Sequence, residues 1–155
     1  MRSTLTALAL LALALGGCSL TDPLKPVASV EAVSVADAGE AAALISAYRA
    51  SKGLGPVSVD PHLNAVAEHQ ARAVAAAGTL SHGAFASRMS AYGVPGHAAE
   101  NLTAGSRSVA DAVARWRASP AHDANLLMSQ ARRIGLARAD SPTRYGRYWA
   151  LVLAQ

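Results

Sequence analysis

The segment 147–154, RYWALVLA, is apolar on both of its faces, and this feature constrains the fold more than any other. In an extended strand, alternate side chains point to opposite sides of the sheet. The two sets are Trp149, Leu151 and Leu153 on one side, and Tyr148, Ala150 and Val152 on the other. A strand that is covered on one side only would alternate apolar with polar side chains. The pattern therefore predicts a strand with helices packed against both faces.

Two further segments complete a small sheet. Residues 132–140, RRIGLARAD, are separated from residues 144–154 by a Ser-Pro turn, and the pair is typical of a β-hairpin. A third strand is expected in AAENLTAG, residues 98–105. Together these segments predict an α+β fold, a three-layer α-β-α sandwich with a small antiparallel sheet.

Apolar spacing and capping residues predict five helices around this sheet. Asp60 is a favourable N-cap, and Gly78 is suited to the left-handed conformation that ends a helix. Ser108 begins a later helix, and Asp111 lies three residues on, where it could complete a capping box. The expected ranges are 38–51, 61–77, 85–92, 109–118 and 120–128.

The N-terminal segment indicates export and lipid attachment. Its apolar run, residues 5–17, is shorter than the roughly 20 residues that a membrane-spanning helix needs. It is typical of a signal peptide. The end of the run, Leu15-Gly16-Gly17-Cys18, resembles the bacterial lipobox, in which the cysteine is acylated (with palmitate, for example) and becomes the mature N-terminus. The alternative is an ordinary signal peptide with a chance cysteine.

These observations divide the chain into three parts. Residues 1–17 are expected to be a lipoprotein signal peptide, and residues 18–37 a lipidated N-terminus and flexible tether. Residues 38–155 are expected to form one domain. Cys18 is the only cysteine, so this domain has no disulfide and must be held together by packing.

Charge patterning excludes one class of partner. The formal net charge is +4, and the basic residues are spread along the chain without a cluster or an interleaved aromatic platform. A nucleic-acid-binding protein would be expected to show such a basic patch. We therefore expect a membrane partner through the N-terminal lipid, and no nucleic acid.

Four segments, taken in order, resemble a known family. They are LSHG at 80–83, AAENLTAG at 98–105, RWRASPAHDANLL at 115–127 and RYWALVLA at 147–154. Their order and spacing are similar to the CAP superfamily of cysteine-rich secretory, antigen 5 and pathogenesis-related class 1 proteins, and most similar to its bacterial SCP-domain branch. The resemblance covers residues 41–154. It implies an α-β-α fold, in agreement with the strand pattern, and identifies residues 38–155 as a CAP/SCP domain.

The resemblance also implies a central cleft that holds two histidines and two acids. His82 matches the first histidine, Glu100 the first acid and His122 the second histidine. The second acid falls on Ser119, so this chain departs from the four-residue pattern. Ser119 has a local explanation as well, because a serine followed by Pro120 is a common helix start.

Three kinds of chemistry remain open for these residues. His82, Glu100 and His122 could ligate zinc, since two histidines and a glutamate with an open fourth position form some catalytic zinc sites. Without a metal, a histidine beside a carboxylate could act as an acid or base. A nucleophile is then required, and neither Ser81 nor Ser119 lies in a G-x-S-x-G elbow. The third interpretation is that the polar groups only fix the fold.

The leading functional hypothesis is a lipid-anchored extracytoplasmic CAP-domain protein that binds a small lipid-like or peptide ligand in the His/Glu cleft. A metal-assisted hydrolase and a structural envelope protein are the alternatives, and no catalytic residue is assigned. Ser19 follows the acylated cysteine where an aspartate would signal inner-membrane retention, so the resemblance favours the outer membrane. His62, His69 and His97 have no motif around them and are expected on the surface.

Overall fold

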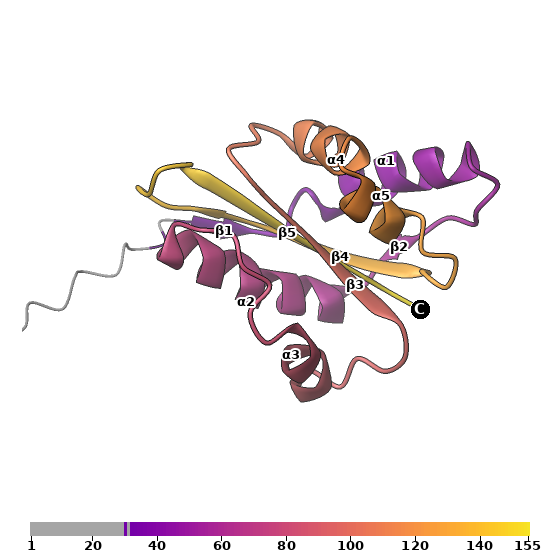
Figure 1. Cartoon of the computed structure of the whole chain (residues 1–155), viewed down its shortest axis with the longest axis horizontal. Coiled ribbons are helices and arrows are strands. Elements are labelled where there is room, and N and C mark those ends of the chain that lie inside the picture. The colour runs from indigo at the N-terminus through magenta and orange to yellow at the C-terminus, as the bar shows by residue number, and fades with distance from the viewer. Residues whose placement is uncertain (1–29, 31) are drawn as a thin grey trace, which may run out of the picture.

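The structure is a computed structural model that describes residues 30 and 32–155 (Figure 1). The described helices and strands, in chain order, are β1 (Ala32–Ser34), α1 (Ala38–Ala50), β2 (Ser58–Val59), α2 (Pro61–Ala77), α3 (Phe85–Ala91), β3 (Ala98–Ala104), α4 (Val109–Arg117), α5 (Pro120–Leu126), β4 (Arg133–Asp140) and β5 (Arg147–Ala154). The predicted signal peptide and the lipidation site Cys18 lie outside the described residues. Within the described part, no helix is both long enough and apolar enough to span a membrane.

The sheet has the order β1-β4-β5-β3, with neighbouring strands antiparallel. The predicted hairpin is present, and its register runs from Arg133 opposite Ala154 to Asp140 opposite Arg147. β2 adds two residues to the free edge of β4 in a parallel orientation. The small sheet is therefore antiparallel apart from this short strand, and the α+β fold is confirmed.

Helices cover both faces of the sheet, as the pattern of residues 147–154 predicts (Figure 1). Trp149, Leu151 and Leu153 are buried in one apolar core with residues from α1, α4 and α5. Tyr148, Ala150 and Val152 are buried in a second core with residues from α2 and α3. None of these six side chains is more than 1% exposed, so the strand is covered on both faces and the sandwich has three layers.

Helix α2 lies unusually close to the sheet. A Cβ atom at Gly135 of β4 would overlap the backbone of Leu63 and Asn64, so only glycine permits this approach. The Asn64 side chain accepts a hydrogen bond from the backbone N–H of Leu136 at 3.0 Å, in the gap that β1 and β2 leave along β4. These two contacts hold α2 against β4, and the loop from α2 to α3 starts from this fixed helix.

Two of the predicted N-cap residues, Asp60 and Ser108, form their capping bonds. The Asp60 carboxylate accepts from the backbone N–H of His62 at 2.8 Å, as an N-cap should. Ser108 accepts from the backbone N–H of Asp111 at 3.2 Å. Asp111 does not return the bond to Ser108, because its carboxylate accepts from the backbone N–H of Arg107 instead.

The ordered domain begins before the predicted boundary at residue 38. β1, residues 32–34, falls within the predicted tether of residues 18–37 and pairs with β4, with Ala32 opposite Asp140. A three-residue edge strand carries no detectable periodicity, so the sequence offered no signal for it. Most of the remaining predicted tether lies outside the described residues.

Candidate functional site

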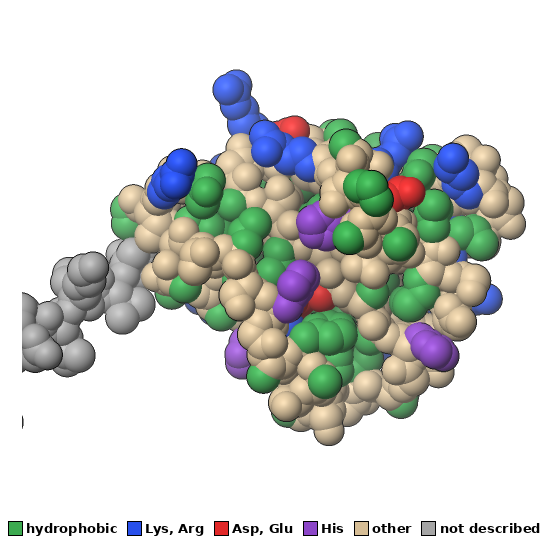
Figure 2. All heavy atoms as spheres, viewed as in Figure 1, with side chains coloured by type: hydrophobic (Ala, Val, Ile, Leu, Met, Phe, Trp, Pro, Cys, Tyr) green, Lys and Arg blue, Asp and Glu red, His purple; other side chains and the backbone are tan. Residues whose placement is uncertain are grey.

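The candidate site is built around β3, the strand at one edge of the sheet. Glu100 and Asn101 are neighbours on this strand, so their side chains point to opposite faces. Glu100 meets groups from the α2–α3 loop and α3, whereas Asn101 meets α5. Figure 2 shows two histidine side chains close to each other near the middle of this side of the molecule, with an acidic group beside one of them.

The first half of the site consists of His82, Arg88 and Glu100, here called the charged bank. The Glu100 side chain is only 1% exposed, and each of its carboxylate oxygens has a partner. His82 Nδ1 lies 2.8 Å from Oε1, and Arg88 Nη2 donates to Oε2 at 2.5 Å. Arg88 also donates to the His82 carbonyl oxygen at 3.3 Å. The carboxylate therefore fixes both the imidazole and the guanidinium.

The charged bank sets the tautomer of His82. A carboxylate only accepts hydrogen bonds, so His82 Nδ1 carries the hydrogen that faces Glu100. In the neutral ring, Nε2 is then a free acceptor. The His82 side chain is 53% exposed, so this atom is accessible to a ligand.

The second half consists of Asn101, His122 and Asn125, here called the amide bank. Asn101 Nδ2 donates to the His122 carbonyl oxygen at 3.0 Å. Asn125 Nδ2 donates to Asn101 Oδ1 at 2.8 Å and to the Glu100 carbonyl oxygen at 3.3 Å. These bonds join α5 to the edge of β3 without any ion pair.

His122 is partly buried, and its surroundings disfavour a positive charge. Burial lowers the pKa of its imidazole, and repulsion from His82 lowers the pKa further. His122 is therefore a neutral imidazole at neutral pH.

Contacts on the far side of α5 support the amide bank. The Tyr48 hydroxyl of α1 donates to the Asp123 carboxylate at 2.8 Å, and the Arg117 guanidinium lies 4.1 Å from the centre of the Tyr48 ring. The bond to Asp123 is the main cause that raises the pKa of Tyr48. These contacts hold α5 against α1 and α4.

Arg49 holds the end of α5 in place. Its side chain is fully buried and donates to carbonyl oxygens of Leu126, Met128 and Ala131, and to Gly55. Burial is the main cause that lowers the pKa of the guanidinium, yet arginine keeps its charge in proteins. The carbonyl dipoles therefore satisfy a buried cation without a carboxylate.

Two adjoining hollows open beside the charged bank. The first, of about 300 Å³, is lined by His82, Phe85, Ala98, Ala99, Glu100 and Asn125. The second, of about 340 Å³, shares Phe85 and Ala98 with it and is otherwise lined mainly by Met89, Val94 and small residues. The two hollows, here together called the cleft, differ in their lining side chains, which include His82 and Glu100 in the first and Met89 and Val94 in the second.

The predicted site residues are placed as follows. His82 and Glu100 are in direct contact, and His122 lies across β3 from them. Ser119 occupies the N-cap position of α5 in an extended conformation, but its side chain makes no capping bond and lines neither hollow. His62, His69 and His97, which were predicted to lie on the surface, are exposed. His62 and His69 both form a hydrogen bond with Tyr92.

The arrangement does not fit a zinc ion. Among the described residues, no group of three or more His, Cys, Asp and Glu side chains is placed to hold a metal. Glu100, one of the three predicted ligands, has one carboxylate oxygen on the Arg88 guanidinium. A cation bound there would lie beside a fixed positive charge, which is electrostatically unfavourable.

Sequence reasoning missed the partners of the predicted residues. Arg88 lies in a short helix, where an arginine has no distinguishing pattern. Asn125 follows His122 by three residues and therefore lies on the same face of α5, which was the one available signal. Asn101 belongs to the same polar network, since its side chain bonds to the His122 carbonyl oxygen and to Asn125.

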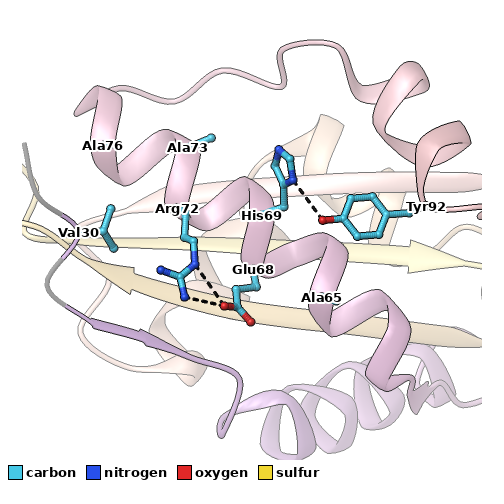
Figure 3. Close-up of a pocket in the computed structure, with 8 residues that line it drawn as sticks. All are labelled: Val30, Ala65, Glu68, His69, Arg72, Ala73, Ala76 and Tyr92. Atoms are coloured by element: carbon cyan, nitrogen blue, oxygen red, sulfur yellow. Dashed lines mark hydrogen bonds and ion pairs between the residues drawn. The ribbon is translucent and has the colours of Figure 1, made fainter. Parts of the chain in front are cut away.

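A larger hollow, of about 660 Å³, lies away from the cleft on the outer face of α2 (Figure 3). It is lined by alanines, Val30, an ion pair between Glu68 and Arg72, and the hydrogen bond of His69 Nδ1 with the Tyr92 hydroxyl at 3.1 Å. Each of these polar groups is already paired within the hollow. Its size alone therefore does not assign a function to it.

Comparisons with known proteins agree with this fold. The profile of the CAP family, described as the cysteine-rich secretory protein family, matches residues 42–153. No curated protein matched the chain in a sequence comparison.

Several solved bacterial structures are similar. An outer surface protein of Borrelia burgdorferi has 21% identity and a TM-score of 0.68, and the match covers 77% of this chain and 92% of that one. An extracellular SCP-domain protein of Bacillus anthracis has 20% identity and a TM-score of 0.65, with 75% of this chain and 39% of that one covered.

A cysteine-rich secretory protein of Staphylococcus aureus has 19% identity and a TM-score of 0.61, and the match covers 74% of this chain and 36% of that one. This chain therefore spans well under half of the Bacillus and Staphylococcus proteins. At these identities the structures support the shared fold, and the profile match over most of the described domain establishes the family. The chain belongs to the CAP family of cysteine-rich secretory proteins.

Proposed function

We propose that this protein is a lipid-anchored, extracytoplasmic CAP-domain protein that binds a small amphipathic ligand, lipid-like or peptide, in the cleft between β3 and α3. The observation that carries the proposal is that two hollows with Phe85 and Ala98 in both linings lie beside the charged bank, one lined by His82 and Glu100 and the other by Met89 and Val94. A ligand with a polar head and an apolar tail matches lining side chains of these two kinds.

The hollow lined by His82 favours a head group that can donate a hydrogen bond. Both Glu100 oxygens are occupied, so the carboxylate itself has little capacity left for a ligand. The accessible group is His82 Nε2, an acceptor in the neutral ring. A hydroxyl or amide N–H on the ligand would satisfy it.

A blocked cleft provides the test. Ala86 is exposed and lines the apolar hollow, so Ala86→Trp should fill that hollow without disturbing a core. Ala110→Trp, at an exposed position on α4, is the matched control. A fluorescent long-chain fatty alcohol titrated into the three proteins should bind wild type and control alike, and Ala86→Trp at least tenfold more weakly.

Native mass spectrometry of protein taken from its own envelope provides a second test. It should detect a co-purified small molecule in the wild type and less of it in Ala86→Trp. Empty spectra together with equal binding of the probe by all three proteins would reject the binding function.

A structural role is the second candidate, and the burial of the charged bank favours it. A Glu100 side chain that is 1% exposed and an Arg88 side chain that is 9% exposed form an ion pair typical of a fixed structural element. If this role were the only one, Ala86→Trp would change neither ligand content nor stability. The metal-assisted hydrolase alternative has no comparable support, because no group of three or more His, Cys, Asp and Glu side chains in the described part of the chain is placed to hold a metal.

The anchor is proposed from the sequence around Cys18. The extracellular and outer-surface descriptions of the similar bacterial proteins support an envelope location. Replacing Cys18 by serine should move the protein from the membrane fraction to the soluble fraction, whereas Ser19→Ala should leave it in the membrane. Unchanged fractionation of Cys18→Ser would reject the anchor.

A further inference from the structure

One end of the molecule combines the entry of the N-terminal segment with two loops. Ala32 pairs with Asp140, so the chain enters the sheet beside the turn of the β4–β5 hairpin. The β3–α4 loop reaches the same end, since Ala104 pairs with Tyr148. Figure 1 shows β1 at the end of the domain where the β4–β5 turn lies.

This end carries several arginines, with Asp140 and Asp111 close to them. Arg107 and Arg144 are exposed, and within the described part of the chain neither guanidinium pairs with a carboxylate. Arg147 is shared, since it donates to Asp140 at 2.9 Å and to the Arg107 carbonyl oxygen at 2.6 Å. The group formed by Arg107, Arg144, Tyr145 and Arg147, here called the hairpin-end patch, therefore has an excess of positive charge.

An aromatic side chain lies at the tip of the patch. Tyr145 is 43% exposed, and the Arg144 guanidinium lies 5.3 Å from the centre of its ring. Tyrosine is enriched at membrane interfaces, where its ring lies at the level of the lipid head groups. Arginines near an anionic leaflet add electrostatic attraction.

A hollow of about 650 Å³ between the two loops could receive a head group. It is lined by Arg107, Arg147, Ser106, Ser141 and Tyr145, and also by Asp140, whose carboxylate accepts from Arg147. The Ser106 side chain is fully buried, and its hydroxyl has no hydrogen-bond partner among the described residues. Such an orphaned hydroxyl is unusual in a folded protein and is consistent with a partner that the isolated chain does not provide.

We propose that the hairpin-end patch docks on an anionic phospholipid surface, with head-group phosphates between Arg107 and Arg147. The proposal rests on the proposed anchor at Cys18, because the anchor would bring the domain to the membrane. The residues between Cys18 and Ala32 span at most about 45 Å when fully extended. Docking would keep the domain against the bilayer, with β1 and the β4–β5 turn nearest the lipid.

The test uses the full chain with Cys18→Ser, so that binding does not depend on acylation. It measures co-sedimentation with vesicles of phosphatidylcholine, with or without phosphatidylglycerol. In this background, Arg107→Glu/Arg144→Glu reverses two charges of the patch. Lys52→Glu/Arg132→Glu is the matched control, because it makes the same charge change at exposed positions near α1 and the start of β4. Residues 1–17 are present in all of these chains, so their contribution to vesicle binding is the same in each.

The parent chain should bind anionic vesicles more tightly than neutral ones, with an affinity that falls as salt is added. The patch variant should lose at least about tenfold in affinity for anionic vesicles, and the control less than about threefold. Equal losses in both variants, or no preference for anionic vesicles, would overturn the proposal. Saturable binding of inorganic phosphate without vesicle binding would overturn it too. Fractionation of the acylated chain tests the anchor separately. A failure of the anchor proposal can therefore be distinguished from a failure of the docking proposal.

Discussion

The charged bank and the amide bank flank the same strand but hold their residues by different means. In the charged bank, one buried carboxylate fixes an imidazole and a guanidinium. In the amide bank, two asparagine side chains bond to backbone and to each other, and no ionised group takes part. The contrast shows that the two histidines, which lie across β3 from each other, are held differently: His82 is oriented through its side chain, whereas His122 is held through its backbone.

The largest expected effect comes from breaking the ion pair of the charged bank. Arg88→Met leaves the Glu100 carboxylate, 1% exposed, with His82 as its only side-chain partner. Removing one partner of a buried pair should lower the free energy of unfolding by about 3 kcal/mol, measured by urea denaturation. Arg88→Met/Glu100→Leu removes both charges and should recover most of the loss. A loss below about 1 kcal/mol for Arg88→Met would mean that the pair is effectively solvated.

A smaller effect is expected in the amide bank. Asn125→Ala removes the bonds to Asn101 and to the Glu100 carbonyl oxygen. Because these are neutral hydrogen bonds on a half-buried residue, the expected loss is about 1.5 kcal/mol. Gln130→Ala, at an exposed position just beyond α5, is the control and should change stability by less than about 0.5 kcal/mol. If Asn125→Ala cost as much as Arg88→Met, the distinction between the two banks would fail.

The smallest effect should be the pH dependence that His122 contributes. The unfolded chain binds a proton near the ordinary pKa of 6.5, whereas the lowered pKa delays protonation of the folded chain. The unfolded state then holds more protons in this window, so stability falls as the pH decreases below about 6.5. Thermal unfolding from about pH 8 to about pH 5 should show a shallower fall for His122→Asn than for wild type. His97→Asn, at an exposed position, should follow the wild-type curve.

The three layers of the fold could be predicted from β5 alone. A strand that is buried on both faces has apolar side chains at successive positions, and few other structures produce this pattern. The five helix positions followed from caps and breakers, whose geometry is local. β1 and β2 could not be predicted, since strands of three and two residues contain less than one full alternation on each face. Their existence depends on the exposed edge of β4, which is a tertiary feature.

The site was predictable only in part, and for a similar reason. Resemblance to the family identified His82, Glu100 and His122, and the structure places the first two in contact. Arg88 and Arg49 were not predicted, although Arg49 follows Ile45 by one helical turn on the buried face of α1. In the sequence, an arginine interrupts the apolar stripe of a helix. The carbonyl oxygens that accept its hydrogen bonds, and so allow its burial, are known only from the structure. Those carbonyls come from residues about eighty positions away in the chain.

The bonds that side chains make to the backbone of β3 have a consequence beyond the cleft. The carbonyl oxygen of Glu100 accepts from Asn125, and that of Leu102 accepts from the Trp116 indole at 3.1 Å. β3 is an edge strand, and edges with free backbone groups are templates for the addition of strands from other molecules. Here the acceptors are already occupied by α4 and α5. The residues that build the amide bank therefore also protect the domain against edge-to-edge aggregation, and loosening α5 would expose a surface on which copies of the chain could polymerise.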